Sequence, residues 1–333
     1  VENILVFVPT SDLKVELVSV IDKSRTEITI PATIQVDGKE YKVTSFNEDA
    51  FKTSNVKSVK LAEGFTEIPD NAFYECSGLT SIEIPSSVTS IGYHAFYQCW
   101  ELTSIEIPSS VTSIGYLAFE GCSGLTSIVV STNNPNYTSI NGVLFDKDIK
   151  TLISCPDGFS GKFSIPSSVT SIGDHAFESC SGLTSIQIPS SVTSIGDHAF
   201  ESCSGLTSIE IPSSVTSIGN SAFYDCSGLT SVEIPSSVTS IGEYAFNECE
   251  SLTSIEIPSS VTSIGDWAFF YCWDLTSIEI PSSVTTIEDW AFFYCWDLTS
   301  IEIPSSVTTI GYYAFDGCSG LTSIKIPSSV TSI

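Results

Sequence analysis

Short segments of alternating polar and hydrophobic residues return along most of the chain. Residues 81–84 read Ser-Ile-Glu-Ile, and this alternation predicts a half-buried strand with Ile82 and Ile84 facing inward and Glu83 facing solvent. Pro85 is expected to end the strand, because proline has no N–H to donate to a ladder.

The residues after this strand predict a second inward-facing edge and a corner. Val88 and Ile91 form another inward pair, on a short strand or an extended turn. Gly92 suits a sharp corner, since glycine tolerates unusual backbone angles. The Ala, Phe and Cys within residues 95–99 are spaced i, i+1, i+4, which predicts the inner face of one helical turn.

The whole pattern repeats every 23 residues. A unit this short cannot bury its own hydrophobic face, whereas stacked units share one continuous core. The sequence therefore predicts a right-handed, β-rich solenoid of stacked short strands and one-turn helical segments. The units begin at Val56, Leu79, Leu102, Leu125, Ser160, Leu183, Leu206, Leu229, Leu252, Leu275, Leu298 and Leu321.

Two regions depart from the regular repeat. The unit of residues 125–159 has 35 residues, and its extra segment around Asp146–Phe159 is expected to protrude as a hairpin or loop. Residues 1–24 are strand-like and are expected to form an N-terminal β cap, which leaves residues 25–333 to the solenoid. Asp37-Gly38 lies between alternating segments and predicts a hairpin turn. The last unit is truncated.

The motif LxxIxIPxxVxxIGxxAFxxCxx resembles the BspA-like leucine-rich repeat family, and the resemblance covers roughly residues 25–333. TIPATIQVDGKEYKVTSF is similar to the family's opening segment, and NNPNYTSINGVLFDKDIKTLISCP to its long irregular repeat. Asn141 and Glu288 depart from the motif at the glycine position, as does Phe46 at an Ile position. The resemblance implies a leucine-rich-repeat solenoid of a secreted or cell-surface protein that mediates adhesion. It brings no catalytic residues and no cofactor.

The charge of the chain limits the classes of partner that it can bind. The net charge is -27, from 12 basic and 39 acidic residues. Such a surface repels nucleic-acid phosphates and anionic lipid headgroups, so neither partner is expected. No stretch approaches the ~20 apolar residues of a membrane span. The expected location, extracellular or on the cell surface, follows from the resemblance, with any leader outside this chain.

Ten of the eleven cysteines occupy the same inward position of the repeat. This placement predicts a ladder of buried thiols that act as small hydrophobic side chains. The odd number and the repeat-equivalent positions disfavour disulfides, and without a CxxC pair no zinc site is expected. Cys155 is outside this register and is the candidate for a free or reactive thiol.

A column of glutamates follows the first Ile of several predicted strands. Neighbouring strands of a sheet lie about 4.8 Å apart, so these side chains should form one file on a sheet face. The file is either an acidic strip that binds cations or a basic partner, or a solvated face inherited by duplication. This acidic strip consists of Glu210, Glu233, Glu256, Glu279 and Glu302.

The variable positions that flank Ala-Phe and Cys are small or polar in the middle of the chain and aromatic in the last units. Exposed aromatic clusters mark interaction sites, and Trp and Tyr dominate binding hot spots. Stacking on sugar rings, packing against a protein, and mere coil-to-coil packing copied by duplication are all compatible with the pattern. This aromatic patch consists of Trp267, Phe270, Tyr271, Trp273, Trp290, Phe293, Tyr294, Trp296, Tyr312 and Tyr313.

Catalysis has little support in the sequence. His94, His175 and His198 share one variable position and are expected to be surface residues. A catalytic triad needs a single non-repeating pocket, which the repeat does not provide. The sequence therefore favours a secreted or cell-surface interaction protein, without metal or cofactor, that binds a host-matrix or cell-surface protein or glycan. The alternatives are a passive spacer arm of a larger surface protein and, more remotely, an enzyme or metal-binding protein centred on the long unit.

Overall fold

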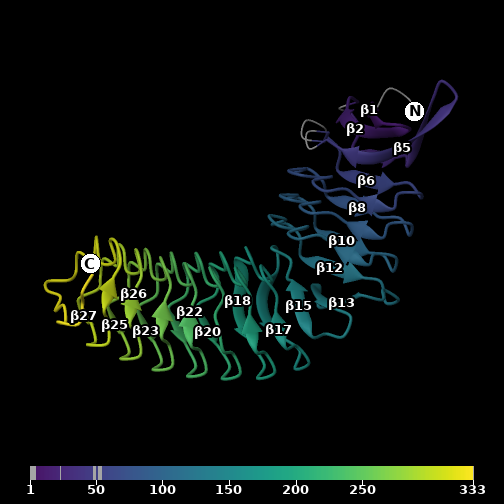
Figure 1. Ribbon diagram of the computed structural model, residues 1–333. Helices are drawn as coiled ribbons and strands as arrows, with labels where there is room; N and C mark the ends of the chain where they lie inside the picture. The colour runs from purple at the N-terminus through teal and green to yellow at the C-terminus, as the bar shows by residue number, and fades with distance from the viewer. Residues whose placement is uncertain (1–4, 23, 48–49, 52–54, 333) are drawn as a thin grey trace. The chain divides into compact units, whose positions relative to one another are not determined.

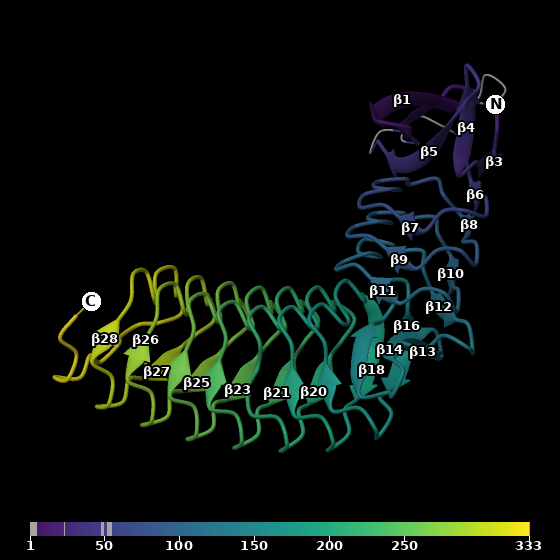
Figure 2. The ribbon, with the colours of Figure 1, turned by 45° about the vertical axis from the view of Figure 1, so that its right-hand side comes forward.

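The computed structural model describes residues 5–22, 24–47, 50–51 and 55–332. In these residues the chain forms short strands joined by turns, with no helix. It divides into two compact units, one of residues 1–148 and 156–158, the other of residues 149–155 and 159–333. Within each unit, coils of the chain stack side by side (Figures 1 and 2).

The first unit begins with a four-stranded sheet in the order β1-β2-β5-β4. Its strands are β1 (Leu5–Ser11), β2 (Lys14–Val20), β4 (Thr33–Val36) and β5 (Lys39–Phe46). β4 and β5 are joined by Asp37-Gly38, whose positive φ angles of 52° and 73° suit a tight hairpin turn, as the sequence predicts. The sheet thus joins residues 5–20 to residues 33–46.

Parallel strands of successive coils follow in the first unit. Equivalent residues 23 positions apart lie opposite each other, as Ser58 and Ser81 do. This in-register pairing confirms the repeat. The strands are β3 (Glu27–Ile30), β6 (Ser58–Leu61), β7 (Glu67–Ile68), β8 (Ser81–Glu83), β9 (Ser90–Ile91), β10 (Ser104–Ile107), β11 (Ser113–Ile114) and β12 (Ser127–Val130).

The long unit contains a hairpin ahead of the segment Asp146–Phe159. β13 (Tyr137–Ile140) and β14 (Val143–Asp146) pair antiparallel around Asn141-Gly142, both with positive φ. The Asn-Gly pair provides the turn geometry that a two-residue hairpin needs. A second turn at residues 147–150 leads into a short strand at Thr151–Ser154, so the extra segment Asp146–Phe159 consists of turns and one strand, and the Asn141-Gly142 hairpin precedes it.

The second unit is built from parallel strands throughout. One file of strands carries the alternating Ser-Ile-Glu segments and a second file carries the shorter Ser-Ile or Thr-Ile segments. The strands are β15 (Thr151–Ser154), β16 (Ser160–Ser164), β17 (Ser171–Ile172), β18 (Gly182–Gln187), β19 (Ser194–Ile195), β20 (Ser208–Glu210), β21 (Ser231–Glu233), β22 (Ser240–Ile241), β23 (Ser254–Glu256), β24 (Ser263–Ile264), β25 (Ser277–Glu279), β26 (Thr286–Ile287), β27 (Ser300–Glu302) and β28 (Thr309–Ile310).

The core of each coil is filled by the Leu, Ile, Val, Ala and Phe positions of the motif. In the second unit the Phe rings form one stack, with neighbouring centroids 5.1–5.6 Å apart and ring planes within 2–9°. Phe223 is fully buried between Phe200 and Phe246. Because every coil contacts only its neighbours, this stack is the continuous element of the core.

The sequence predicts a one-turn helical segment after the repeat glycine, and this prediction is wrong. Residues 93–98 form turns in which His94 and Gln98 take left-handed φ angles of 50° and 54°. The N–H of Phe96 donates to Ala118 O at 2.8 Å, and that of Gln98 to Glu120 O at 2.8 Å. These donors therefore bond to the next coil and not four residues back, because the left-handed residues turn the backbone sideways.

The repeat glycine allows two coils to approach closely and does not serve a special φ angle. A Cβ on Gly92 would lie 2.5 Å from Asp70 N, and one on Gly219 would lie 2.6 Å from Gly196 O. Neither glycine has a positive φ. The corner proposed from the sequence is thus a place where two coils touch backbone to backbone.

Candidate interaction surface

The aromatic patch occupies the turns of the last coils, on the side of each coil that carries the left-handed residues. Trp267 and Trp290 hold the left-handed position before Ala, with φ of 60° each, and Tyr271 and Tyr294 hold the one before Cys. Most of its rings are only partly buried, so they face outward as the sequence predicts. Phe293 is the exception, with 9% of its surface exposed.

The longest file of rings runs through the position before Ala. Trp267 stacks on Trp290 with centroids 4.8 Å apart and planes within 9°. Trp290 in turn stacks on Tyr313 at 4.5 Å, and Tyr244 extends the file on the other side at 5.6 Å from Trp267. The file therefore spans four successive coils.

Three shorter files lie beside it. Trp273 stacks on Trp296 at 5.0 Å and 6°. The two Tyr rings before Cys stack at 5.4 Å, and the two Phe rings after Ala-Phe at 5.0 Å. The rings thus pack from coil to coil, and most of them remain partly exposed. Exposure is greatest at Tyr312 (75%), Tyr313 (55%) and Trp296 (44%).

Carboxylates border the patch on the preceding coils. The pKa of Glu250 is raised by burial and by the charges of Asp225, Glu248 and Asp274. The Tyr224 hydroxyl donates to Glu248 at 3.2 Å, and the pKa of Tyr224 is raised to about 12 by burial and by that carboxylate.

A second carboxylate group lies beside the Trp267 file. Glu288 occupies the glycine position of its coil, and its pKa is raised by burial and by the charges of Asp266 and Asp289. Asp266 is also fixed in place, because its carboxylate accepts the N–H of Asp289 at 3.0 Å.

The acidic strip forms the file that the sequence predicts. The five glutamates lie opposite one another on β20, β21, β23, β25 and β27, which pair in register, and all five are exposed. The last four strands line a shallow concavity on that sheet face. The strip and the aromatic patch are borne by different segments of each coil, the strand and the turns.

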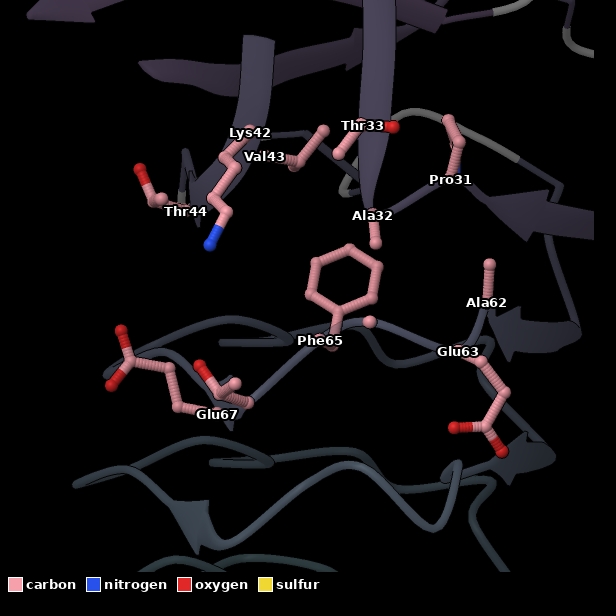
Figure 3. Close-up of a pocket in the computed structure, with 12 residues that line it drawn as sticks. Pro31, Ala32, Thr33, Lys42, Val43, Thr44, Ala62, Glu63, Phe65 and Glu67 are labelled. Atoms are coloured by element: carbon pink, nitrogen blue, oxygen red, sulfur yellow. The ribbon is translucent and has the colours of Figure 1, made fainter. Parts of the chain in front are cut away.

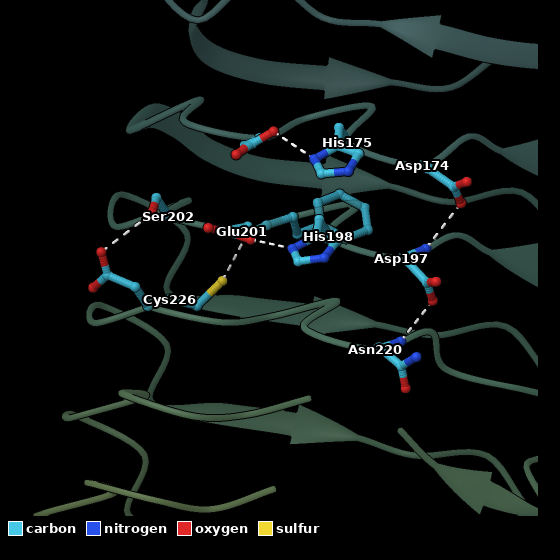
Figure 4. A network of polar contacts seen from close by, with 11 residues as sticks. Asp174, His175, Asp197, His198, Glu201, Ser202, Asn220 and Cys226 are labelled. Atoms are coloured by element: carbon cyan, nitrogen blue, oxygen red, sulfur yellow. Dashed lines mark hydrogen bonds and ion pairs between the residues drawn. The ribbon is translucent and has the colours of Figure 1, made fainter. Parts of the chain in front are cut away.

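A ladder of Asp and Asn side chains after the repeat glycine was not recognised in the sequence. Figure 4 shows Asp174 accepting the N–H of Asp197 and Asp197 accepting that of Asn220, at 3.0 and 2.7 Å. Each side chain therefore ties its coil to the next. The recurring Asp or Asn at this position was the available signal, but its meaning depends on which coils are neighbours.

The histidines are not isolated surface residues. His175 and His198 stack with centroids 4.5 Å apart, and each contacts a glutamate three residues later (Figure 4). Burial lowers the pKa of His175, but the hydrogen bond to Glu178 and the charges of Glu178, Glu201 and Asp174 outweigh it, so the pKa is raised.

All eleven cysteines are buried and unpaired by disulfides. In most coils the thiol donates to the carbonyl of the Phe 26 residues earlier, as Cys226 does to Phe200 O at 3.1 Å. Burial raises the pKa of Cys226, Cys249 and Cys272. Cys155 is 2% exposed, which argues against the reactive thiol considered from the sequence.

One further hollow lies in the first unit, between β4, β5 and the turn after β6. Figure 3 shows Phe65 at its base, with Lys42 on one wall and Glu67 opposite. Both charged residues are exposed, and the hollow opens to solvent. Among the residues that the structure describes, no group of three or more His, Cys, Asp or Glu side chains is arranged to hold a metal. No helix in the described part of the chain is long and apolar enough to cross a membrane.

The stacked coils define the class of the protein, a leucine-rich-repeat solenoid. The BspA type leucine-rich repeat region matches the chain in six copies, within residues 44–160, 159–272 and 216–333. The chain therefore belongs to the BspA type leucine-rich repeat family.

Solved structures of leucine-rich repeat proteins share the fold. One from Eubacterium ventriosum is 26% identical, with a TM-score of 0.68, covering 98% of this chain and 95% of that one. One from Bacteroides ovatus is 29% identical, with a TM-score of 0.53, covering 99% and 94%. The pneumococcal vaccine antigen PcpA is 18% identical, with a TM-score of 0.58, covering 93% and 92%, and shows likeness of fold alone. No curated protein matches the chain.

Proposed function

We propose that this chain is a secreted or cell-surface interaction protein that binds a protein or glycan partner through its aromatic patch, in the manner of an adhesin. The observation that supports this most is the concentration of stacked, partly exposed rings on one turn face of consecutive coils. The equivalent turn positions within residues 174–181 and 197–204, in the middle of the array, carry Asp, His, Glu or Ser on the same backbone. Clusters of Trp and Tyr are the usual energetic centres of interfaces.

The test replaces Trp267, Trp273, Trp290 and Trp296 with serine. Serine already occupies both repeat positions in other coils, at Ser221 and at residues 181, 204 and 227, so the backbone accommodates it. The full chain and this variant are screened against extracellular-matrix proteins and a glycan array. Binding by the full chain and its loss in the variant are expected.

Trp100 provides the matched control. It occupies the same repeat position as Trp273 and Trp296, is 53% exposed and lies outside the patch. The Trp100→Ser variant is expected to bind like the full chain. Equal binding by the four-Trp variant and the full chain would remove the patch from the proposal.

The second candidate is a passive spacer arm of a larger surface protein. It is supported by the near-copied units that begin at Leu252 and Leu275 and by the coil-to-coil stacking of their rings. Absence of any binding by the full chain would favour this function. The acidic strip is a weaker candidate surface, and Glu→Gln changes along it test its part in any binding that is found.

A further inference from the structure

The aromatic patch lies in a segment of the chain that has no lysine or arginine to balance the charge of its carboxylates. Residues 163–324 contain no lysine and no arginine, although acidic residues occur in every coil. Eight of the twelve basic residues precede Asn71. Within this segment only His175 and His198 can become positive, and both already contact glutamates. The carboxylates next to the patch therefore have no lysine or arginine of their own segment as a partner.

These carboxylates continue the files of rings. Glu250 holds in its coil the position that Trp273 and Trp296 hold in the next two, and Glu248 holds that of Tyr271. The coils are adjacent, because Asp274 N–H donates to Glu250 O at 3.1 Å. Each of these two files therefore runs from a carboxylate directly into stacked rings.

One ring of the patch keeps a face free of other rings. Trp296 stacks on Trp273 through one face, and Ser319 follows at the equivalent position of the next coil. Among the described residues, no other ring stacks on the second face, and Trp296 is 44% exposed. Asp297 follows directly in the chain and is exposed. An exposed indole and an exposed carboxylate thus belong to adjacent residues of the same turn.

This combination suits a guanidinium or ammonium group. A cation is attracted to the face of an aromatic ring, and Trp is the strongest such partner. The planar guanidinium can stack on a ring and at the same time donate charge-assisted hydrogen bonds to a carboxylate. A neutral sugar carries no charge and cannot form such an ion pair. Glu248, Glu250 and Asp274 form the carboxylate border of the patch. A cation bound at this border would also relieve the repulsion among the three carboxylates.

We propose that the occupant of the aromatic patch is an arginine- and lysine-rich segment of another protein. This inference rests on the proposed function, because it names the partner of the same surface. The segment places cationic side chains on the carboxylate border and over the open face of Trp296. A neutral glycan would use the rings alone.

The experiment uses the full chain and a synthetic arginine-rich peptide, with a peptide of the same sequence in which citrulline replaces arginine. Citrulline keeps the size and planarity of the side chain and removes its charge. Calorimetric titration is expected to show binding of the arginine peptide that is at least about tenfold tighter than that of the citrulline peptide. Equal affinities would overturn the inference.

Two variants separate a located site from general attraction to an acidic protein. Glu248→Gln with Glu250→Gln removes two charges at the border, and Glu101→Gln with Glu106→Gln removes two exposed charges in the first unit. The border variant is expected to weaken binding about tenfold, while the distant variant changes it less than about twofold. Equal weakening by both would show attraction by net charge only and would overturn the inference.

The four-Trp variant, which keeps the charge of the full chain, distinguishes this inference from the proposed function. It is expected to lose at least about tenfold in affinity for the arginine peptide. If it binds that peptide like the full chain but loses binding to neutral glycans or to a protein without basic segments, the patch is a binding site and its cationic partner is refuted. If no ligand's binding depends on the four tryptophans, both proposals fail.

Discussion

The Phe stack of the second unit allows a stability prediction that depends on position in the array. Phe223 is fully buried and stacked on both sides at 5.3 Å, whereas Phe315 is half-buried and stacks only on Phe292. Truncation of a buried Phe to Ala costs about 3–5 kcal/mol, and each lost ring contact adds about 0.5–1.5 kcal/mol beyond burial. Phe223→Ala loses two ring contacts and should therefore cost about 4–8 kcal/mol, and Phe315→Ala roughly half as much.

Urea unfolding tests this prediction with two signals. Four of the five tryptophans lie within residues 267–296, so fluorescence follows the coils after Phe223 while far-UV circular dichroism follows all coils. In a one-dimensional array, a weakened internal coil separates the segments on either side. We expect the two signals to coincide in the unchanged chain and to diverge in Phe223→Ala. Phe223→Leu is the control that keeps most of the volume. Equal losses in Phe223→Ala and Phe315→Ala would refute the continuous core.

Four further predictions follow from named contacts. The contact with Glu178 raises the pKa of His175. The stabilisation that this contact provides should be complete below about pH 6.5, the ordinary histidine pKa, and should disappear as the pH rises through the raised pKa of the folded state. Urea midpoints of His175→Gln and of the full chain across this pH range measure it. Glu288→Gln should stabilise the chain near neutral pH, with a gain that shrinks as the pH falls through the raised pKa of that carboxyl, in the same assay. Asp197→Ala leaves the Asn220 N–H without its acceptor and should cost about 1 kcal/mol, whereas Asp197→Asn should be near neutral. Ellman's reagent should leave the native thiols almost unmodified and react with all eleven in urea.

Three of these predictions have a specific outcome that would contradict their reasoning. A His175→Gln effect that is constant with pH would mean that the contact with Glu178 involves no charge. A loss in Glu288→Gln would mean that the carboxylate has a cationic partner in solution. Rapid modification of several native thiols would mean that the coils open easily.

The repeat spacing made most of the fold predictable. The 23-residue period places Ser58 opposite Ser81 and Glu233 opposite Glu256, because a fixed period and parallel stacking together determine the register. The buried positions could be predicted equally well, because the alternation of polar and hydrophobic residues reflects which side chains face the core. The acidic strip could thus be placed from the sequence alone.

The turns could not be predicted in the same way. The spacing of Ala, Phe and Cys fits both a helical turn and a turn stabilised by the next coil, and only the neighbouring coil decides between them. A signal was present, because glycine occupies the position before Cys at Gly121 and Gly317, and Asn or His occupies the position before Ala in several coils. These residues tolerate a left-handed backbone. Trp267 and Trp290 occupy the same position before Ala, and they concealed this signal because bulky residues are unusual in a left-handed backbone.

The conformation of those tryptophans bears on why the patch exists. A left-handed backbone costs a non-glycine residue about 1–2 kcal/mol, and a bulky side chain is unusual there. Ser221 shows that the fold does not need an aromatic residue at this position. Stacking of Trp267 on Trp290 offsets part of the cost, at about 0.5–1.5 kcal/mol per pair. If stacking alone explained the rings, Trp267→Gly, which removes both the strain and the ring, would lower stability. If it leaves stability unchanged or raises it, stacking does not account for the rings, as expected if they serve binding.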